Sequence, residues 1–262
     1  MIHPCLQLQR ATLVLILGTF ACSKHESEDS QQSLTDAQIL RNNLCATFSI
    51  SSVERCDRGT FDLYADAFCG QRNISVYETS PGKWIRDTDP CFVDGQDVGS
   101  KSECSQDTYL AAVHSSISRG DKAMAQRMLT HLEANDWICG EGDVGVTRVT
   151  FPGLIRKAAG VQGLTAIPDP FENFRGHQLG LWLYGHARLD GALMAAGPTL
   201  FNKLSEQHPA SPLFEAAKHR WVDGDYSRAI DLTMSGTECA SYWGSCPWPV
   251  YAAMAVRLME GR

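Results

Sequence analysis

The sequence predicts an α-helical domain built from helical hairpins and preceded by an export signal. Apolar residues recur at spacings of three and four along most of the chain, which is the pattern of a helix with one buried face. Side chains that cap helices precede several of these runs. A Gly-Asp corner also occurs twice, at residues 120–125 and 224–229. A length of 262 residues and a hydrophobic fraction of 44% suit such a domain.

The N-terminus has the features of an export signal. Residues 11–21 form an uncharged apolar run that follows Arg10 and ends directly before Cys22. The run is too short to span a bilayer and is typical of a signal-peptide core. A small residue before Cys22 resembles a bacterial lipobox, although Thr19 replaces the usual leucine, and the same residues also fit an ordinary signal-peptidase site. We predict a signal peptide over residues 1–21 and lipidation, including palmitate, at Cys22.

The cysteine count agrees with this prediction. Of the ten cysteines, Cys5 leaves with the signal peptide, and lipidation would use Cys22. An even number then remains for disulfide bonds, as expected in an oxidising compartment. The pair Cys239 and Cys246, which surrounds a tryptophan, suits a local disulfide loop. The eight remaining cysteines are 45, 56, 69, 91, 104, 139, 239 and 246.

Residues 22–34 are polar and cannot fold alone, so we predict a tether between a lipid anchor and a domain over residues 35–262. Ser23 after the lipidated cysteine resembles lipoproteins of the bacterial outer membrane. The alternative is a secreted or periplasmic protein. Loss of residues 1–21 removes one arginine and no acidic residue, so the net charge changes from -7 to -8. This charge, with no cluster of lysine and arginine in the sequence, disfavours nucleic acid, so we expect no nucleic-acid partner; the lipid would be the only attachment to a membrane.

Helix boundaries within the domain are marked by capping residues. Thr35 begins a capping box, and Ser105 precedes a helix that Gly120 ends, after which Asp121 begins the next. The same device recurs where Gly224 ends a helix that starts after Ser211. Further helices are predicted over residues 60–69, 153–159, 174–189, 199–207 and 248–260.

Residues 70–104 are the irregular part of the predicted domain. A short hairpin around residues 80–82 is followed by a loop rich in glycine and aspartate. We expect Cys69, Cys91 and Cys104 to staple this segment. Long loops in compact domains are often functional, so the segment is a candidate for the site.

The stretch "CGEGDVGV", residues 139–146, matches the G-x-G-x-x-G pattern of dinucleotide sites through Gly140, Gly142 and Gly145. In those sites the pattern follows a strand and opens a helix, whereas here it follows a predicted helix. We therefore interpret residues 137–148 as a glycine-rich loop. No spacing of cysteines and histidines predicts a metal site, no other motif predicts a cofactor, and no serine or cysteine nucleophile has a supporting pattern.

Two loops place carboxylates beside tryptophan and arginine, which is the combination that a sugar site needs. Tryptophan stacks on a pyranose ring, and carboxylates bind hydroxyl groups or transfer protons. The alternative is that the carboxylates form ion pairs and that the tryptophans belong to the core. The first loop holds Trp84, Arg86, Asp87 and Asp89, and the second holds Trp137, Glu141, Asp143 and Arg148.

The helix over residues 174–189 is a third candidate. His177, Tyr184 and Arg188 share one face at helical spacing and could line a binding site or form a solvated face. Asp107 lies in the first turn of its predicted helix. Interaction with the helix dipole explains that position without catalysis.

Four stretches, "GKWIRD", "SQDTYLAAV", "NDWICGEGDVGVTRVTFPGL" and "RGHQLGLWLYGHARLDG", together resemble a group of exported bacterial proteins built as an α/α barrel or toroid. The group combines a W-x-R-D segment, a helix that opens with S-R-D and an N-W-x-x-G-x-G-D loop. Its architecture is similar to the α/α toroids of many polysaccharide lyases and glycoside hydrolases. The matching positions are Trp84, Arg86, Asp87, Asp107, Trp137, Gly140, Gly142, Asp143 and Thr147, and Gln106 replaces the arginine.

We therefore expect a lipid-anchored, disulfide-stapled, all-α envelope protein of α/α barrel or toroid type that binds or cleaves a polysaccharide. As an enzyme it would be a glycoside hydrolase or polysaccharide lyase, with Asp87 or Glu141 as proton donor and Asp143 as base. The alternative is a non-catalytic helical interaction or scaffold lipoprotein of the cell envelope. The residues expected to bind substrate are Trp84, Arg86, Trp137, Arg148, His177 and Tyr184.

Overall fold

The computed structural model describes residues 57–70, 72–90, 92–93, 96–97, 103–141, 144–161, 176–189 and 227–235, with single positions between 38 and 45 and between 202 and 225. This part of the chain is mostly helical, with small sheets and two disulfide bonds. The predicted signal peptide and tether lie outside it, as do Cys22, Cys239 and Cys246. None of the described helices is long and apolar enough to cross a membrane.

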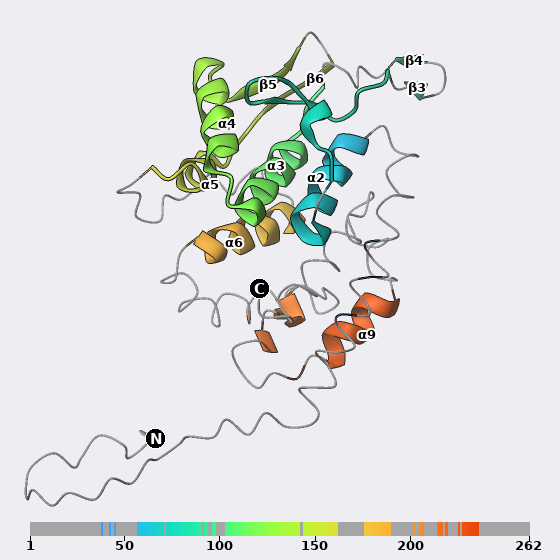
Figure 1. The fold of residues 1–262 in the computed structure, drawn as a ribbon. Helices are drawn as coiled ribbons and strands as arrows, with labels where there is room; N and C mark the ends of the chain where they lie inside the picture. Colours follow the sequence, from blue (N-terminus) through green and yellow to red (C-terminus); the bar gives the residue numbers. More distant parts are fainter. Residues whose placement is uncertain are drawn as a thin grey trace, which may run out of the picture.

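Two helices at the centre of the fold, α2 (Arg58–Cys69) and α3 (Gln106–Arg119), lie side by side and run in the same direction (Figure 1). The hydroxyl groups of Thr60 and Thr108, each in the first turn of its helix, are 2.8 Å apart. Two turns further along, the Ser115 hydroxyl donates to the Asp66 carboxylate at 2.5 Å. The N-terminal ends of both helices therefore lie together.

The helical hairpin predicted after residue 105 is confirmed. The Ser105 hydroxyl accepts a hydrogen bond from the Thr108 amide at 3.1 Å, which begins α3. Gly120 ends α3 in the left-handed region, with a φ of 66°. The Asp121 carboxylate then accepts from the Met124 amide at 3.0 Å and begins α4 (Lys122–Ala134). These local hydrogen bonds explain why the hairpin was readable from the sequence.

Two further helices, α5 (Pro152–Ala158) and α6 (Gly176–Leu189), pack against α3. Gly185 permits this close contact, because a Cβ atom there would lie 3.0 Å from a Leu154 methyl carbon and 3.3 Å from the His114 ring. The helices predicted over residues 60–69, 153–159 and 174–189 are confirmed within about two residues. Another described helix, α9 (Ser227–Ser235), follows the predicted start near Asp225.

The core lies between α2, α3, α4, α5 and α6. Apolar side chains on the facing sides of these helices are withdrawn from water, which is the main stabilising contribution to such a fold. The largest fully buried side chains are Trp84, Tyr109, Tyr184, Phe68, Phe151, Phe214, Leu63, Leu110, Met128, Leu132 and Leu154.

Three antiparallel two-stranded sheets accompany the helices, so the expectation of an entirely helical domain is correct only in its main part. The first joins β1 (Glu78–Ser80) to β2 (Lys83–Trp84) through the predicted turn, after the short 3-10 helix η1 (Ser75–Tyr77). The second pairs β3 (Phe92–Val93) with β4 (Gln96–Asp97). The third pairs β5 (Ile138–Glu141) with β6 (Val144–Arg148).

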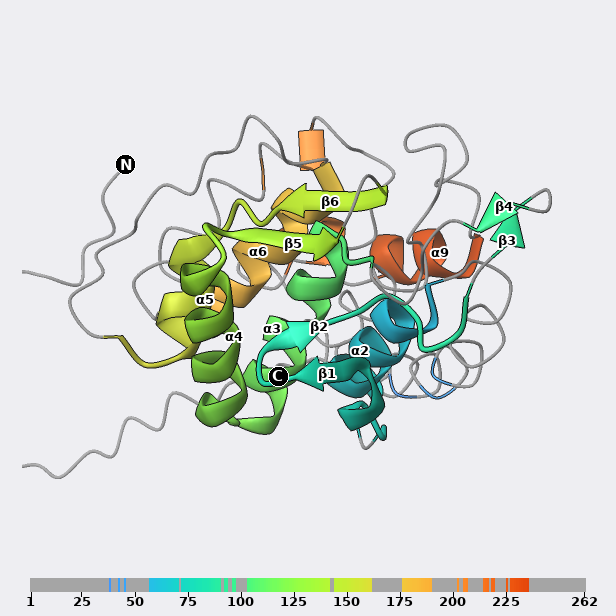
Figure 2. The ribbon, with the colours of Figure 1, turned by 90° about the horizontal axis from the view of Figure 1, so that it is seen from above.

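The third sheet corrects the interpretation of residues 137–148 as a loop. Ile138 pairs with Arg148, and Glu141 pairs with Val144, so only two residues connect the strands. The β-branched residues of β6 favour an extended chain, and Gly-Asp is a sequence that short hairpin turns accept. Seen from above in Figure 2, this hairpin crosses the end of α3.

Each of the two described disulfides connects one end of the irregular segment to a residue outside it. Cys69 is bonded to Cys45, and Cys104 is bonded to Cys139 on β5. Of the three cysteines expected to staple residues 70–104, Cys69 and Cys104 are therefore confirmed in disulfides, and their partners lie before and after the segment. Cys91 lies outside the described residues.

Candidate functional site

The W-x-R-D segment, residues 84–87, is fixed across the first turn of α2. The Gly59 amide donates to the Arg86 carbonyl oxygen at 2.5 Å, and the Ile85 amide donates to the Tyr77 carbonyl oxygen at 3.1 Å. A Cβ atom on Gly59 would lie only 2.5 Å from the Ile85 carbonyl oxygen. Glycine is therefore required where the two backbones meet.

Asp87 caps α2 from this neighbouring segment. Its side chain is 5% exposed, accepts from the Arg58 amide at 3.4 Å, and lies 3.4 Å from the Arg58 Nε atom. It also accepts from the Asp89 amide at 3.2 Å. All these contacts hold the segment in place, so the structure gives Asp87 a positioning role.

Asp57 occupies the N-cap position of α2, but its side chain makes no capping hydrogen bond. Its carboxylate instead accepts from the Arg86 Nε atom at 3.1 Å. The Nη1 atom of the same guanidinium donates to the Glu103 carboxylate at 3.2 Å. Burial raises the pKa of Asp57 above its ordinary value, although Arg86 opposes the shift. A carboxyl group with a raised pKa suits a general acid.

Asp107 lies beside this ion pair, in the first turn of α3. Its carboxylate accepts from the Gln178 amide nitrogen on α6 at 3.3 Å. Its negative charge helps to raise the pKa of Asp57 and also stabilises the Arg86 cation. The two carboxyl groups thus share one electrostatic environment. We call the group formed by Asp57, Arg86, Glu103 and Asp107 the carboxyl cluster.

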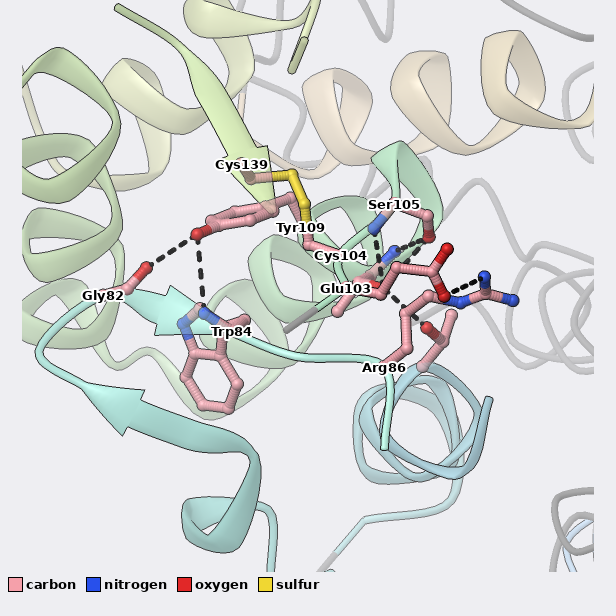
Figure 3. The surroundings of a disulfide bond; sticks show 10 residues. Gly82, Trp84, Arg86, Glu103, Cys104, Ser105, Tyr109 and Cys139 are labelled. Carbon is pink, nitrogen blue, oxygen red and sulfur yellow. Dashed lines mark hydrogen bonds and ion pairs between the residues drawn. A yellow bond between two sulfur atoms is a disulfide. The ribbon is translucent and has the colours of Figure 1, made fainter. Parts of the chain in front are cut away.

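The disulfide between Cys104 and Cys139 brings the second predicted segment to the same place. Figure 3 shows this bond next to Ser105, which caps α3, and next to Glu103, which contacts Arg86. The Thr150 hydroxyl, two residues after β6, donates to the Gln106 side-chain oxygen at 2.6 Å. The segments around residues 84–89 and 137–148 therefore both attach to residues 103–106.

Trp84 belongs to the core and is only 2% exposed. Its amide donates to the Tyr109 hydroxyl at 3.4 Å, and that hydroxyl donates to the Gly82 carbonyl oxygen at 3.1 Å (Figure 3). The ring therefore has no surface on which a sugar could stack in this conformation.

Trp137 is half-buried next to the start of β5. The guanidinium carbon of Arg156 lies 5.3 Å from the centre of its ring, so a cation covers part of the indole. Trp137 also packs against the core cluster. Arg148 on β6, which pairs with Ile138 on β5, is exposed.

Tyr184 also lies in the core, where its ring stacks on His114 at 5.8 Å and contacts Phe68 at 6.1 Å. Burial lowers the pKa of His114 to about 3, so this imidazole is neutral near pH 7. His177 lies in α6, but its side chain is outside the described part. The same holds for the Glu141 side chain, and Asp143 lies wholly outside it.

Asp57, Glu103 and Gln178 were not predicted from the sequence, and Asp107 was explained by its interaction with the helix dipole. Asp57 directly precedes α2 in the sequence, where aspartate is an ordinary N-cap, and this conceals the role of its side chain. The available signal was the W-x-R-D segment, because its arginine needs acidic partners.

No three histidine, cysteine, aspartate or glutamate side chains in the described part of the chain are placed to hold a metal ion. Comparison of the sequence and structure with protein-family models, curated proteins and solved structures finds no match. The carboxyl cluster is therefore the feature of the described structure from which a function can be inferred.

Proposed function

We propose that this protein is a lipid-anchored protein of the bacterial envelope whose helical domain binds and cleaves a polysaccharide at the carboxyl cluster. The observation that supports this proposal best is Asp57, whose carboxyl group has a raised pKa although it contacts Arg86. A second carboxyl group, that of Asp107, lies in the same environment. Pairs of neighbouring carboxyl groups, one of which has a raised pKa, are typical of acid/base sites in glycosidases.

The proposed reaction is hydrolysis. Asp57 donates its proton to the glycosidic oxygen as the bond between that oxygen and the anomeric carbon breaks. Asp107 accepts a proton from a water molecule whose oxygen forms the new bond to the anomeric carbon. Arg86 holds Asp57 in place, and Asp87 positions Arg86 through its contacts with the start of α2.

The hairpin formed by β5 and β6 is proposed to contact the polysaccharide. It carries Glu141 and Asp143, which the sequence analysis selected, and Cys139 ties it to the start of α3. Glu141 and Asp143 would bind sugar hydroxyl groups in this proposal. Elimination, as in a polysaccharide lyase, is the other reaction that the same carboxyl groups could serve.

The proposed fold of the whole domain is an α/α toroid. In such a fold the inner helices run in one direction, and α2 and α3 do so. Two disulfides support export to an oxidising compartment, and the lipobox-like Cys22 supports a lipid anchor in the outer membrane. A secreted or periplasmic location is the alternative.

A non-catalytic scaffold is the second candidate function. It is favoured by the structural contacts of the predicted site residues, because Trp84 is buried and Asp87 caps a helix. A scaffold would use the ion pairs of Arg86 only to hold the segment in place.

Turnover by single variants separates the two functions. The full-length chain, purified in detergent, would be incubated with a panel of bacterial and algal polysaccharides while reducing ends and unsaturated-sugar absorbance are followed. We expect Asp57→Asn and Asp107→Asn each to lower turnover by about 100-fold or more, because each removes a proton-transfer group. Asp89→Asn, which changes an exposed partner of Arg58, is the control and should keep wild-type turnover.

Unchanged turnover in both variants would contradict the proposed catalytic roles. A wild-type chain that releases neither reducing ends nor unsaturated sugar from the whole panel would favour the scaffold.

A further inference from the structure

A buried tyrosine beneath the carboxyl cluster is not explained by the fold. Tyr64 is 3% exposed, and its hydroxyl oxygen has no hydrogen-bond partner in the described part of the chain. Buried hydroxyl groups in proteins almost always have a partner. Tyr109 shows the usual case, because its hydroxyl bonds both Gly82 and Trp84.

Tyr64 lies on the face of α2 that carries Asp57. Tyr64 follows Asp57 by seven residues, which is two turns of α2, so both lie on one face of the helix. Long side chains on a helix lean toward its N-terminus, which here is the end that carries Asp57. Thr60, one turn before Tyr64 on α2, contacts Thr108, the neighbour of Asp107, at 2.8 Å, so this face of α2 meets the start of α3. The charges of Asp107 and Asp57 add to burial in raising the pKa of Tyr64.

Among the described residues, the charge at this end of α2 and α3 is negative. Arg58 and Arg86 are already paired with carboxylates. The N-terminal ends of α2 and α3, which carry the positive ends of the helix dipoles, already have hydrogen-bond acceptors. Asp87 accepts from the Arg58 amide of α2, and Ser105 accepts from the Thr108 amide of α3. These two guanidinium groups are surrounded by five carboxyl groups, those of Asp57, Asp87, Asp89, Glu103 and Asp107.

This arrangement has consequences for the ligand. Uronate or sulfate groups would be repelled by the excess of carboxylates. A protonated amino group would be attracted, and it has three N–H donors. Asp57, Asp107 and the Tyr64 oxygen provide three acceptors for those donors.

We propose that Asp57, Asp107 and Tyr64 form a subsite for a saccharide that carries a free, protonated amino group. The Asp107 carboxylate supplies the negative charge that binds the ammonium group, and the carbonyl oxygen of the Asp57 carboxyl group and the Tyr64 oxygen accept its other two hydrogen bonds. This inference rests on the proposed function, because it takes the ligand to be a glycan, and it specifies the class as amino sugars without an N-acetyl group.

Calorimetric titration of the full-length chain tests the subsite. The probes are a glucosamine tetramer, the N-acetylglucosamine tetramer and a galacturonate tetramer. We expect the glucosamine tetramer to bind at least tenfold more tightly than either other probe. Tyr64→Phe and Asp107→Asn should each weaken its binding by fivefold or more, and Tyr64→Phe should leave binding of the acetylated tetramer unchanged.

Two control variants exclude indirect effects. Asp62→Asn removes one negative charge from α2 outside the cluster, where Asp62 accepts from the Tyr77 hydroxyl, and should leave the amine preference intact. Tyr109→Phe removes a buried hydroxyl with partners elsewhere and should also leave it intact. The thermal midpoint of Tyr64→Phe should not fall below that of the wild type, because the lost hydroxyl bonds nothing in the described structure.

Equal binding of the acetylated and free-amine tetramers, absence of binding, or a preference that survives both Tyr64→Phe and Asp107→Asn would overturn the inference. A loss of preference in Asp62→Asn as large as in Asp107→Asn would also overturn it, since general charge would then explain the binding. Amine-selective binding without turnover would support the subsite and contradict the enzyme. Turnover without a preference for the free amine would support the enzyme and contradict the subsite.

Discussion

Gly82→Ala is expected to lower the free energy of unfolding by about 3 kcal/mol, because two separate costs act at this position. Gly82 has a φ of 80°, which side chains rarely adopt. A Cβ atom there would also lie 2.0 Å from the Arg127 carbonyl oxygen on α4. The backbone would have to move away from α4, and with it the start of the W-x-R-D segment.

Gly120→Ala is the matched control for this prediction. Gly120 has a φ of 66°, but a Cβ atom there would meet nothing within 4 Å. Only the backbone cost of about 1 kcal/mol applies. Denaturant unfolding of both variants measures the difference. Equal losses of stability in the two variants would show that the approach of Gly82 to α4 does not exist in solution.

Asp66→Asn is expected to cost about 2 to 3 kcal/mol, because a buried carboxylate loses its ion pair with the partly exposed Arg119. The Asp66 side chain is 1% exposed and lies between α2 and α3. It accepts two hydrogen bonds from the Arg119 guanidinium, at 2.6 and 2.7 Å, and others from the Ser115 hydroxyl and the Arg72 amide. Asparagine would leave part of the Arg119 charge without a partner.

The same carboxylate predicts a dependence of stability on pH. Burial alone would raise the pKa of Asp66, but the bonds from Arg119, Ser115 and the Arg72 amide lower it below the ordinary value of 3.8. The contribution of Asp66 to the free energy of unfolding is therefore fully present above about pH 4, and it is lost as the pH falls through the lowered pKa. Unfolding curves between pH 2 and 7 should show a larger loss in the wild type than in Asp66→Asn, where Glu78, whose pKa is also lowered, still contributes.

Asp62→Asn is the control for Asp66→Asn, since Asp62 lies one turn earlier on α2 and accepts a bond from Tyr77. We expect it to cost about 1 kcal/mol. If Asp66→Asn were no more costly than this control, the buried network would not hold α2 to α3.

The helices could be predicted because their ends are set by local interactions. Ser105, Gly120 and Asp121 each act on backbone groups within a few residues, and the sequence alone carries that information. The hairpin at residues 138–148 was missed because glycine-rich chains form loops and strands alike. Its pairing depends on contacts with the rest of the fold, including Cys104.

The candidate site could be predicted only in part. The W-x-R-D segment was selected from the sequence, and its Arg86 lies in the carboxyl cluster. Its partner Asp57 could not be found, because residues 29 positions apart meet only when the backbone of Arg86 lies on Gly59. The burial of Trp84 was also hidden, since tryptophan beside carboxylates suits a core as well as a sugar site.

The most direct test of the central claim, that Asp57 and Asp107 form one acid/base pair, is an NMR titration of the Asp57 carboxyl carbon. In the wild type its pKa should lie above 3.8, because burial disfavours the charged form. In Asp107→Asn the pKa should fall, because a neighbouring negative charge is removed. An Asp57 that titrates at its ordinary value in the wild type, or with the same pKa in both proteins, would contradict the claim.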